Sequence, residues 1–108
     1  MKREPKEILE KVVKERVKRM LRNHSAWWHM PVQMGHGASG VDFHGCHRSR
    51  FFGIETKRPG KYPTPRQELT LEQIREAGGK TFVIGCEYDQ DSDSFSGESE
   101  LLAWLLNP

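Results

Sequence analysis

The spacing of the apolar residues changes near residue 24, and this change constrains the fold more than any other feature of the sequence. Over residues 5–23 the apolar side chains recur every three or four positions, which predicts an amphipathic helix with a Lys/Arg face. From residue 26 onward, short apolar segments alternate with glycine, proline and polar segments, as is typical of strands separated by turns. A chain of 108 residues supports one modest core, so we predict a single α/β domain, residues 1–108.

Local signals predict the remaining elements. A second helix is expected from Thr64, a good N-cap, and Pro65, a residue favoured at the first helical position, to Ala77, where two glycines follow. The polar segment 47–50 joins two strand patterns, which indicates a hairpin. Strands are expected at residues 26–32, 41–43, 51–57 and 80–86, a mobile acidic loop at 89–97, and a last helix at 101–106.

Charge is distributed unevenly along the chain. The net charge is +2, yet all Lys and Arg residues lie in the first four fifths of the sequence, and the charged residues of 87–108 are all acidic. This distribution suits a polyanionic partner such as DNA, although an ordinary solvated face is also often basic. No apolar run is long enough to cross a membrane, so we predict a cytoplasmic protein, with Cys46 and Cys86 reduced.

Two acids and a lysine form the most informative group of residues. Glu55 and Lys57 are two positions apart on one predicted strand and therefore face the same side, and a hairpin partner can bring Asp42 beside Glu55. Two carboxylates and a backbone carbonyl, here that of Thr56, suffice to hold a hard ion such as Mg²⁺ on a phosphate substrate. Lys57 would orient the attacking water or stabilise charge on the phosphate. An Asp and a Glu-x-Lys also occur at this spacing by chance.

Glu10 falls inside the apolar arc of the first predicted helix, between Val17 and Leu21. A carboxylate that points toward a core is costly unless it is paired or binds a cation, so Glu10 is expected to point inward and to have a partner. The alternative is a glutamate at the edge of the arc that reaches water.

A zinc site is a competing interpretation of the histidines and cysteines. The residues concerned are His36, His44, Cys46, His47 and Cys86. Their spacing lacks the paired pattern of structural zinc modules, and strand alternation would put Cys46 and His47 on opposite faces. We therefore do not expect zinc. The same alternation lets only one of Trp27 and Trp28 be buried.

Four segments carry a further signal: Gly37–Phe43, Phe52–Lys57, Thr64–Gln67 and Ala77–Gly79. Together they resemble the VRR-NUC branch of the PD-(D/E)XK nucleases, in particular its short stand-alone members from phages and bacteria. The match spans roughly residues 8–86. The resemblance implies an α-β-β-β-α-β core, followed here by a C-terminal helix, a Mg²⁺ or Mn²⁺ site, and a location in the cytoplasm of a bacterium or a phage's host.

The resemblance also implies a role for each matching residue. Asp42, Glu55 and Lys57 match the catalytic motif, Glu10 matches a glutamate of the first helix, and Gln67 matches the glutamine that opens the next helix. The implied metal ligands are Glu10, Asp42, Glu55 and the Thr56 carbonyl, and the implied catalytic residues are Asp42, Glu55, Lys57 and Gln67. Val41 stands where the family name has a proline, which affects backbone stiffness and not ligation. Gln67 has a second interpretation, since it also completes a capping box with Thr64.

These observations predict a metal-dependent DNA endonuclease that prefers branched DNA such as four-way junctions. Basic residues in the loops around the site are expected to contact DNA phosphates: Arg48, Arg50, Arg58, Lys61 and Arg66. The last helix is apolar around most of its circumference, which favours a two-fold homodimer. The alternatives are a basic DNA-binding module that does not cut, and a nickase or exonuclease on other DNA.

Overall fold

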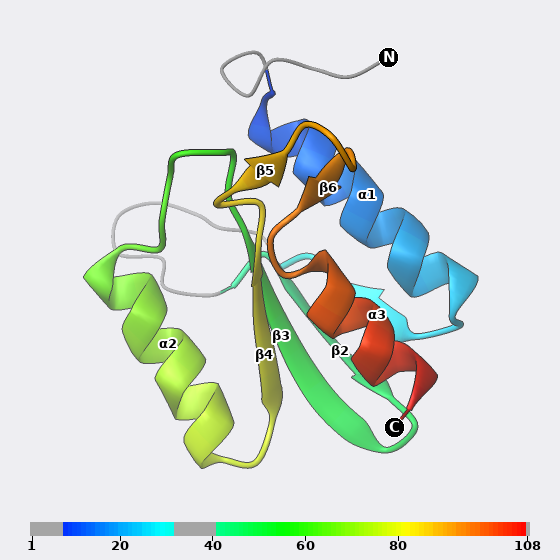
Figure 1. Cartoon of the computed structure of the whole chain (residues 1–108). Coiled ribbons are helices and arrows are strands. Elements are labelled where there is room, and N and C mark those ends of the chain that lie inside the picture. The colour runs from blue at the N-terminus through cyan, green and yellow to red at the C-terminus, as the bar shows by residue number, and fades with distance from the viewer. Residues whose placement is uncertain (1–7, 32–40, 108) are drawn as a thin grey trace.

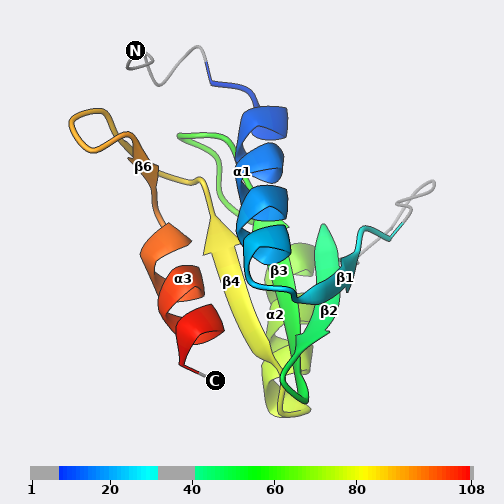
Figure 2. The same ribbon diagram turned by 90° about the vertical axis from the view of Figure 1, so that its right-hand side faces the viewer.

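The chain forms a mixed four-stranded sheet with helices on both faces. The computed structural model describes residues 8–31 and 41–107. Helices α1 (Glu10–Asn23) and α3 (Glu98–Leu106) lie on one face of the sheet, and α2 (Pro65–Glu76) lies on the other (Figures 1 and 2). In the described part of the chain, no helix has the length and apolar character needed to cross a membrane. The predictions for residues 5–7, for residue 32 and for the glycine-rich segment fall outside the described residues.

The strands are β1 (Trp27–His29), β2 (Phe43–His47), β3 (Arg50–Thr56) and β4 (Lys80–Ile84). They lie in the order β1-β2-β3-β4, with β1 antiparallel to β2, β2 antiparallel to β3, and β4 parallel to β3. The α-β-β-β-α-β order predicted from the sequence is confirmed. The parallel pair requires a crossover, which α2 supplies.

The turn of the β2–β3 hairpin has Arg48 and Ser49 as its central residues. Their φ angles are 51° and 70°, so both are in the left-handed conformation. This conformation matches the right-handed twist of the two strands that the turn connects. The predicted turn is therefore confirmed. The strand before it was predicted too short, because β2 begins at Phe43 and continues to His47.

Helix α1 begins later than predicted. Leu9 is its N-cap and has extended backbone angles, and Ile8 before it is buried in the core. The apolar pattern from residue 8 onward reflects burial, and only the part from Glu10 is helical. Within the helix, Val13, Val17 and Leu21 are fully buried, which confirms the amphipathic pattern.

Helix α2 begins and ends where its signals predict. Thr64 is the N-cap, Pro65 is the first helical residue, and Ala77 is the C-cap. Gly78 follows with φ +100°, a conformation that glycine adopts without strain. The local signals of this helix were sufficient to predict it.

The segment predicted as a mobile acidic loop instead contains a small hairpin. Its strands are β5 (Tyr88–Asp89) and β6 (Ser94–Phe95), and Phe95 is buried. Helix α3 begins at Glu98, three residues before the predicted start, because Gly97 serves as its N-cap and Glu98 accepts a hydrogen bond from the Phe95 N–H at 2.8 Å. One buried aromatic residue anchors a segment whose composition is otherwise that of a loop.

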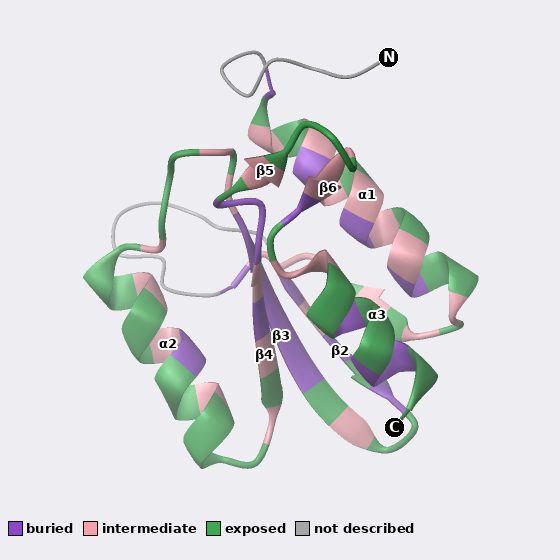
Figure 3. Ribbon diagram, in the orientation of Figure 1, coloured by how far each residue is buried: buried purple, intermediate pink, exposed green. Residues whose placement is uncertain are grey.

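The main core lies between the sheet and the α1–α3 layer (Figure 3). Trp28 packs on Phe43 at a ring distance of 5.6 Å, whereas Trp27 is 65% exposed, so the two tryptophans face opposite sides as predicted. The buried residues of this core are Ile8, Val13, Val17, Leu21, Phe43, Phe52, Ile54, Phe82, Ile84, Phe95, Leu101, Trp104 and Leu105.

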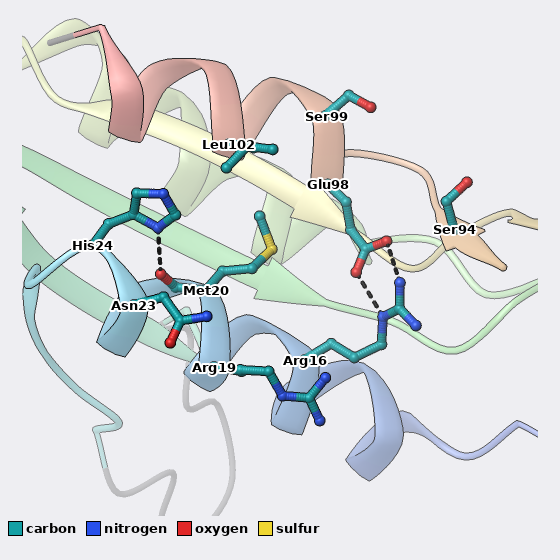
Figure 4. Close-up of a pocket in the computed structure, with 9 residues that line it drawn as sticks. All are labelled: Arg16, Arg19, Met20, Asn23, His24, Ser94, Glu98, Ser99 and Leu102. Atoms are coloured by element: carbon teal, nitrogen blue, oxygen red, sulfur yellow. Dashed lines mark hydrogen bonds and ion pairs between the residues drawn. The ribbon is translucent and has the colours of Figure 1, made fainter. Parts of the chain in front are cut away.

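Arg16 joins α1 to α3 and to the β5–β6 hairpin. Its guanidinium donates to Glu98 at 2.7 and 2.9 Å and to the Asp93 carbonyl at 2.9 Å, and it lies 4.9 Å from the centre of the Phe95 ring. The pair closes one end of a groove of about 420 Å³ between the two helices (Figure 4). Bidentate Arg–carboxylate pairs are among the stronger polar contacts in proteins.

We predict that Arg16→Gln lowers the free energy of unfolding by about 1–3 kcal/mol, because the partly buried Glu98 loses a charged donor. Lys18→Gln is the matched control, since Lys18 pairs with the exposed Glu15. Urea unfolding of both variants measures the difference. Equal stability of the two variants would show that Arg16 does not tie the helices together.

Candidate active site

The β2–β3 hairpin brings Asp42 and Glu55 to the same place. Phe43 pairs with Ile54, so Asp42, which directly precedes β2, lies next to Glu55 near the end of β3. Glu55 is only 2% exposed. The proximity that the sequence predicted for these two acids is therefore present in the structure.

Thr56 holds one oxygen of Asp42. The Thr56 backbone N–H and hydroxyl both donate to Asp42 Oδ2, at 2.8 and 2.7 Å. The other oxygen, Oδ1, lies 3.7 Å from the Lys14 ammonium. The two donors fix the carboxylate and leave Oδ1 on the side of a cation. Sequence analysis had assigned only the Thr56 carbonyl to the site, and that role stays a prediction.

The carboxylate of Glu55 is buried, and only one of its two oxygens lies near a positive charge. Its Oε2 lies 3.6 Å from Lys57 Nζ, while its Oε1 is buried and makes no hydrogen bond to any described residue. Burial, followed by repulsion from Asp42, raises the pKa of Glu55 to about 7, against the opposing attraction of Lys57. An oxygen with no donor beside a second carboxylate is a position that favours a cation.

Glu10 lies near this pair but does not point into the core. It is the first residue of α1, its side chain is 40% exposed, and it forms an ion pair with Lys14 one helical turn later. It is still close enough for its charge to contribute to the raised pKa of Glu55. Glu10 therefore lies at the edge of the apolar arc and reaches water, which is the alternative given above, and the partner expected for it is present in Lys14.

Lys14 is a residue of the site that sequence analysis missed. Its ammonium lies between the Glu10 carboxylate and Oδ1 of Asp42. The only available signal was the spacing of four residues from Glu10, which is common on exposed helices and did not single it out.

Gln67 forms the capping box. Its side-chain oxygen accepts from the Thr64 N–H at 2.9 Å, and its backbone N–H donates to the Thr64 hydroxyl at 3.2 Å. Of the two interpretations of Gln67, the helix cap is the one present in the structure. A catalytic role stays a prediction, and it would require the side chain to leave the cap.

The basic residues divide between two ends of the sheet. Arg58 and Lys61 follow β3, and Arg66 lies in the first turn of α2, so all three are at the end that holds Glu55. Arg48 and Arg50 lie at the opposite end of the hairpin, because His47 pairs with Arg50 four positions away from Ile54. The expectation that they flank the site is wrong. Arg50 instead lies 4.3 Å from the centre of the Trp104 ring and belongs to the packing of α3.

The residues of the zinc alternative are dispersed. His47 is buried and its Nε2 lies 2.9 Å from the Leu105 carbonyl, whereas Cys46 is exposed on the other face. His36 lies outside the described residues. Across residues 8–31 and 41–107, no three His, Cys, Asp or Glu side chains are grouped so as to hold a metal ion, and this includes Glu10, Asp42 and Glu55.

The donor set at Asp42 and Glu55 nevertheless fits a hard divalent cation. Both residues offer carboxylate oxygens, and the buried Glu55 Oε1 has no other partner among the described residues. Mg²⁺ keeps several waters and needs only one or two carboxylates, so a third acid is not required. The site is thus a two-carboxylate centre with a lysine next to each acid.

Gly85 holds the backbone of Lys57 in place. A Cβ atom at Gly85 would lie 1.8 Å from the Lys57 carbonyl oxygen, and φ at Gly85 is +111°. The Lys57 N–H donates to the neighbouring Ile84 carbonyl at 2.8 Å. Glycine within a strand pattern can indicate such a close approach, and this was the signal in the predicted strand 80–86.

No protein-family model matches the chain, and a comparison with curated proteins found no match. The resemblance to the VRR-NUC nucleases therefore rests on the residues named above.

The raised pKa of Glu55 predicts how stability depends on pH in the metal-free protein. An unfolded glutamate titrates near 4.5 and the folded one near about 7, so the folded state binds more protons between these values. Stability should fall as pH rises through this window and stay low above it. Glu55→Gln removes the cost, and we expect it to stabilise the protein by up to roughly 3 kcal/mol at pH 8 and by little at pH 5.

Urea unfolding in the presence of a chelator at the two pH values checks this expectation. Glu72→Gln, a change at an exposed residue of α2, is the control and should have no such pH-dependent effect. A Glu55→Gln variant that is no more stable than the original protein at pH 8 would mean that the buried carboxylate carries no penalty.

Proposed function

We propose that this protein is a Mg²⁺- or Mn²⁺-dependent DNA endonuclease that hydrolyses phosphodiester bonds. The observation that carries the proposal is the buried carboxylate of Glu55, which lies beside Asp42 and has an oxygen without a partner among the described residues. A purely structural position would not favour such an arrangement, since an unpaired buried carboxylate is costly. The resemblance of the surrounding segments to VRR-NUC nucleases supports the same function.

Each residue of the site has a separate role in the proposed hydrolysis. Asp42 and Glu55 would hold the cation, with Thr56 fixing the orientation of Asp42. A bound divalent ion neutralises phosphate charge and lowers the pKa of a coordinated water. The Lys57 ammonium, 3.6 Å from Glu55, is placed to orient the attacking water or to bind a phosphate oxygen.

Two further features bear on the DNA substrate. Arg58 and Lys61 follow the end of β3 that holds Glu55, and Arg66 lies in the first turn of α2, so we expect them to bind phosphates on either side of the cleaved bond. Branched DNA, and four-way junctions in particular, is the substrate that the resemblance implies. One chain contributes one such site, so two symmetric cuts in a junction require two copies.

Helix α3 supports a homodimer. Leu101, Trp104 and Leu105 are buried against the chain's own core, whereas Leu102 and Leu106 are 40% and 57% exposed. The two exposed leucines are four residues apart and therefore lie on the same side of the helix. A self-complementary contact through this side is the simplest way to cover them.

A DNA-binding module that does not cut is the rival function, and one observation favours it. Lys14 and Lys57 already place a cation beside each carboxylate. In that case the acids would need no metal ion. A nickase or an exonuclease would keep the same chemistry on a different DNA substrate.

We predict that the protein cuts DNA in Mg²⁺ or Mn²⁺ and not in the presence of a chelator. Asp42→Asn and Glu55→Gln each remove an anionic ligand without changing the shape of the side chain, and each should reduce cleavage by at least about a hundredfold. Lys57→Ala should have a similar effect. Gel assays on linear duplex, flap, single-stranded and four-way junction DNA measure the rates.

The glutamates of α1 provide a matched comparison for this experiment. Glu10→Gln should weaken cleavage, because Glu10 lies at the site, and Glu15→Gln should not, because Glu15 is exposed and pairs with Lys18. Cleavage by the Asp42→Asn protein at the original rate would show that the active site is misassigned. Metal-independent DNA binding without any cleavage would favour the rival function.

The proposed dimer gives a separate prediction. Light scattering after size exclusion at micromolar concentration should give twice the chain mass of 12.5 kDa. The double variant Leu102→Ser, Leu106→Ser should be monomeric and should cut a junction more slowly, because two sites no longer act together. Leu69→Ser, at an exposed position of α2, is the control.

A monomer mass for the original protein would rule out the dimer at these concentrations. The preference for branched DNA fails if a linear duplex is cut as fast as a junction of the same length and composition.

A further inference from the structure

Four aromatic and imidazole rings form a continuous row across β1, β2 and β3. Trp27 and His29 are 5.6 Å apart, His29 and His44 are 5.1 Å apart, and His44 and Phe51 are 6.1 Å apart, measured between ring centres. The strand register explains the row, because Trp27 pairs with Cys46, His29 with His44, and Cys46 with Phe51. We call these four residues, Trp27, His29, His44 and Phe51, the ring row.

The ring row is accessible although it consists of large side chains. Trp27 is 65% exposed and Phe51 is 46% exposed, and His29 is exposed as well. Helix α2 packs on this face of the sheet, but its main contacts are with β3 and β4. Exposed aromatic rings that are grouped, rather than scattered singly, mark a binding surface.

The ring row lies on the same face of the sheet as the proposed catalytic acid. Alternation along β3 places Phe51, Gly53 and Glu55 on one side, and a Cβ atom at Gly53 would lie 2.8 Å from Ile74 of α2. Phe51 and Glu55 are four residues apart, which is roughly 13 Å along the strand. Helix α2 covers β3 between them at Gly53, so a ligand strand that crosses the row would reach the site over β2, where His44 is two residues from Asp42.

A hollow adjoins the row at Phe51. It has a volume of about 400 Å³ and lies between Phe51 and the C-terminal half of α2, where Ile74, Ala77 and Gly79 line it. Both flat exposed rings and space beside one of them are present on this face.

We propose that the ring row binds unpaired bases of a DNA strand by stacking, and that it guides this strand toward Asp42 and Glu55. This inference rests on the proposed nuclease function and specifies, among branched substrates, those with unpaired bases next to the cleaved bond, such as a flap, rather than fully paired junctions. Base–aromatic stacking contributes about 1–3 kcal/mol per base and does not depend on sequence. A duplex keeps its bases stacked on one another, so it gains nothing from the row.

The chemistry of the row favours bases over other ligands. None of its four residues is acidic, so nothing in the row repels a polyanion. The exposed leucines suited to contact with a second copy of the chain lie on α3, which covers the other face of the sheet.

The test compares binding of single-stranded and duplex DNA with cleavage prevented. Fluorescence anisotropy in a chelator measures the affinity for oligothymidylate and for a duplex of equal length. Trp27→Ala should weaken binding of oligothymidylate by roughly tenfold and leave duplex binding unchanged, and Phe51→Ala should act in the same direction. Trp27→Phe should bind nearly as well as the original protein, and the control Leu69→Ala, exposed on α2 and outside the lining of the hollow, should bind equally well.

The outcomes separate this inference from the proposed function. Equal effects of Trp27→Ala on both DNA forms, or no effect on either, would overturn the ring row as a base-binding surface, as would a change in oligomeric mass in this variant. If affinity for oligothymidylate depends on Trp27 but no DNA is cut in Mg²⁺ or Mn²⁺, the inference about binding holds and the nuclease function fails. If DNA is cut but Trp27→Ala matches Leu69→Ala in binding, only the inference fails.

Discussion

The burial of the Glu55 carboxylate is the constraint on which the arrangement around it depends. A carboxylate at 2% exposure needs compensation, and the chain supplies only part of it through Lys57. Asp42 adds a second negative charge beside Glu55, and two hydrogen-bond donors from Thr56 hold the Asp42 carboxylate in that position. The result is a site in which repulsion between acids is maintained by the fold. Carboxylates whose pKa is raised by burial and by a neighbouring acid are found most often at functional sites.

Helix α1 connects this site to the rest of the molecule. Its first turns carry Glu10 and Lys14, which face the acids, and the next turn carries Arg16, which holds α3 and the β5–β6 hairpin. Val13, Val17 and Leu21 of the same helix are buried in the core. The position of the site's outer charges is therefore set by the same packing that stabilises the fold. A shift of α1 along the sheet would alter both together.

Sequence predicted those features that depend on neighbouring residues. The boundaries of α2, the turn at Arg48 and the alternation of Trp27 and Trp28 are local, and all were predicted. The β5–β6 hairpin depends on burial of Phe95 by distant elements, and the distance of Arg50 from the site depends on strand register over the whole hairpin. The candidate acids could be chosen from spacing, but the pairing of Lys14 with Glu10 rests on which of several lysines faces the sheet.

The capping box at Gln67 has a consequence for the flexibility of α2. Its side chain has one carbonyl oxygen, and the Thr64 N–H already uses it. If Gln67 turns toward a bound phosphate, the Thr64 N–H loses its acceptor, a hydrogen bond that contributes about 1 kcal/mol. The Thr64 hydroxyl still caps the helix through the Gln67 N–H, so the loss would loosen only the residue before the first turn, which carries Arg66. Hydrogen exchange at the Thr64 amide would report the loss of this bond, and the complete capping box would be a property of the free protein.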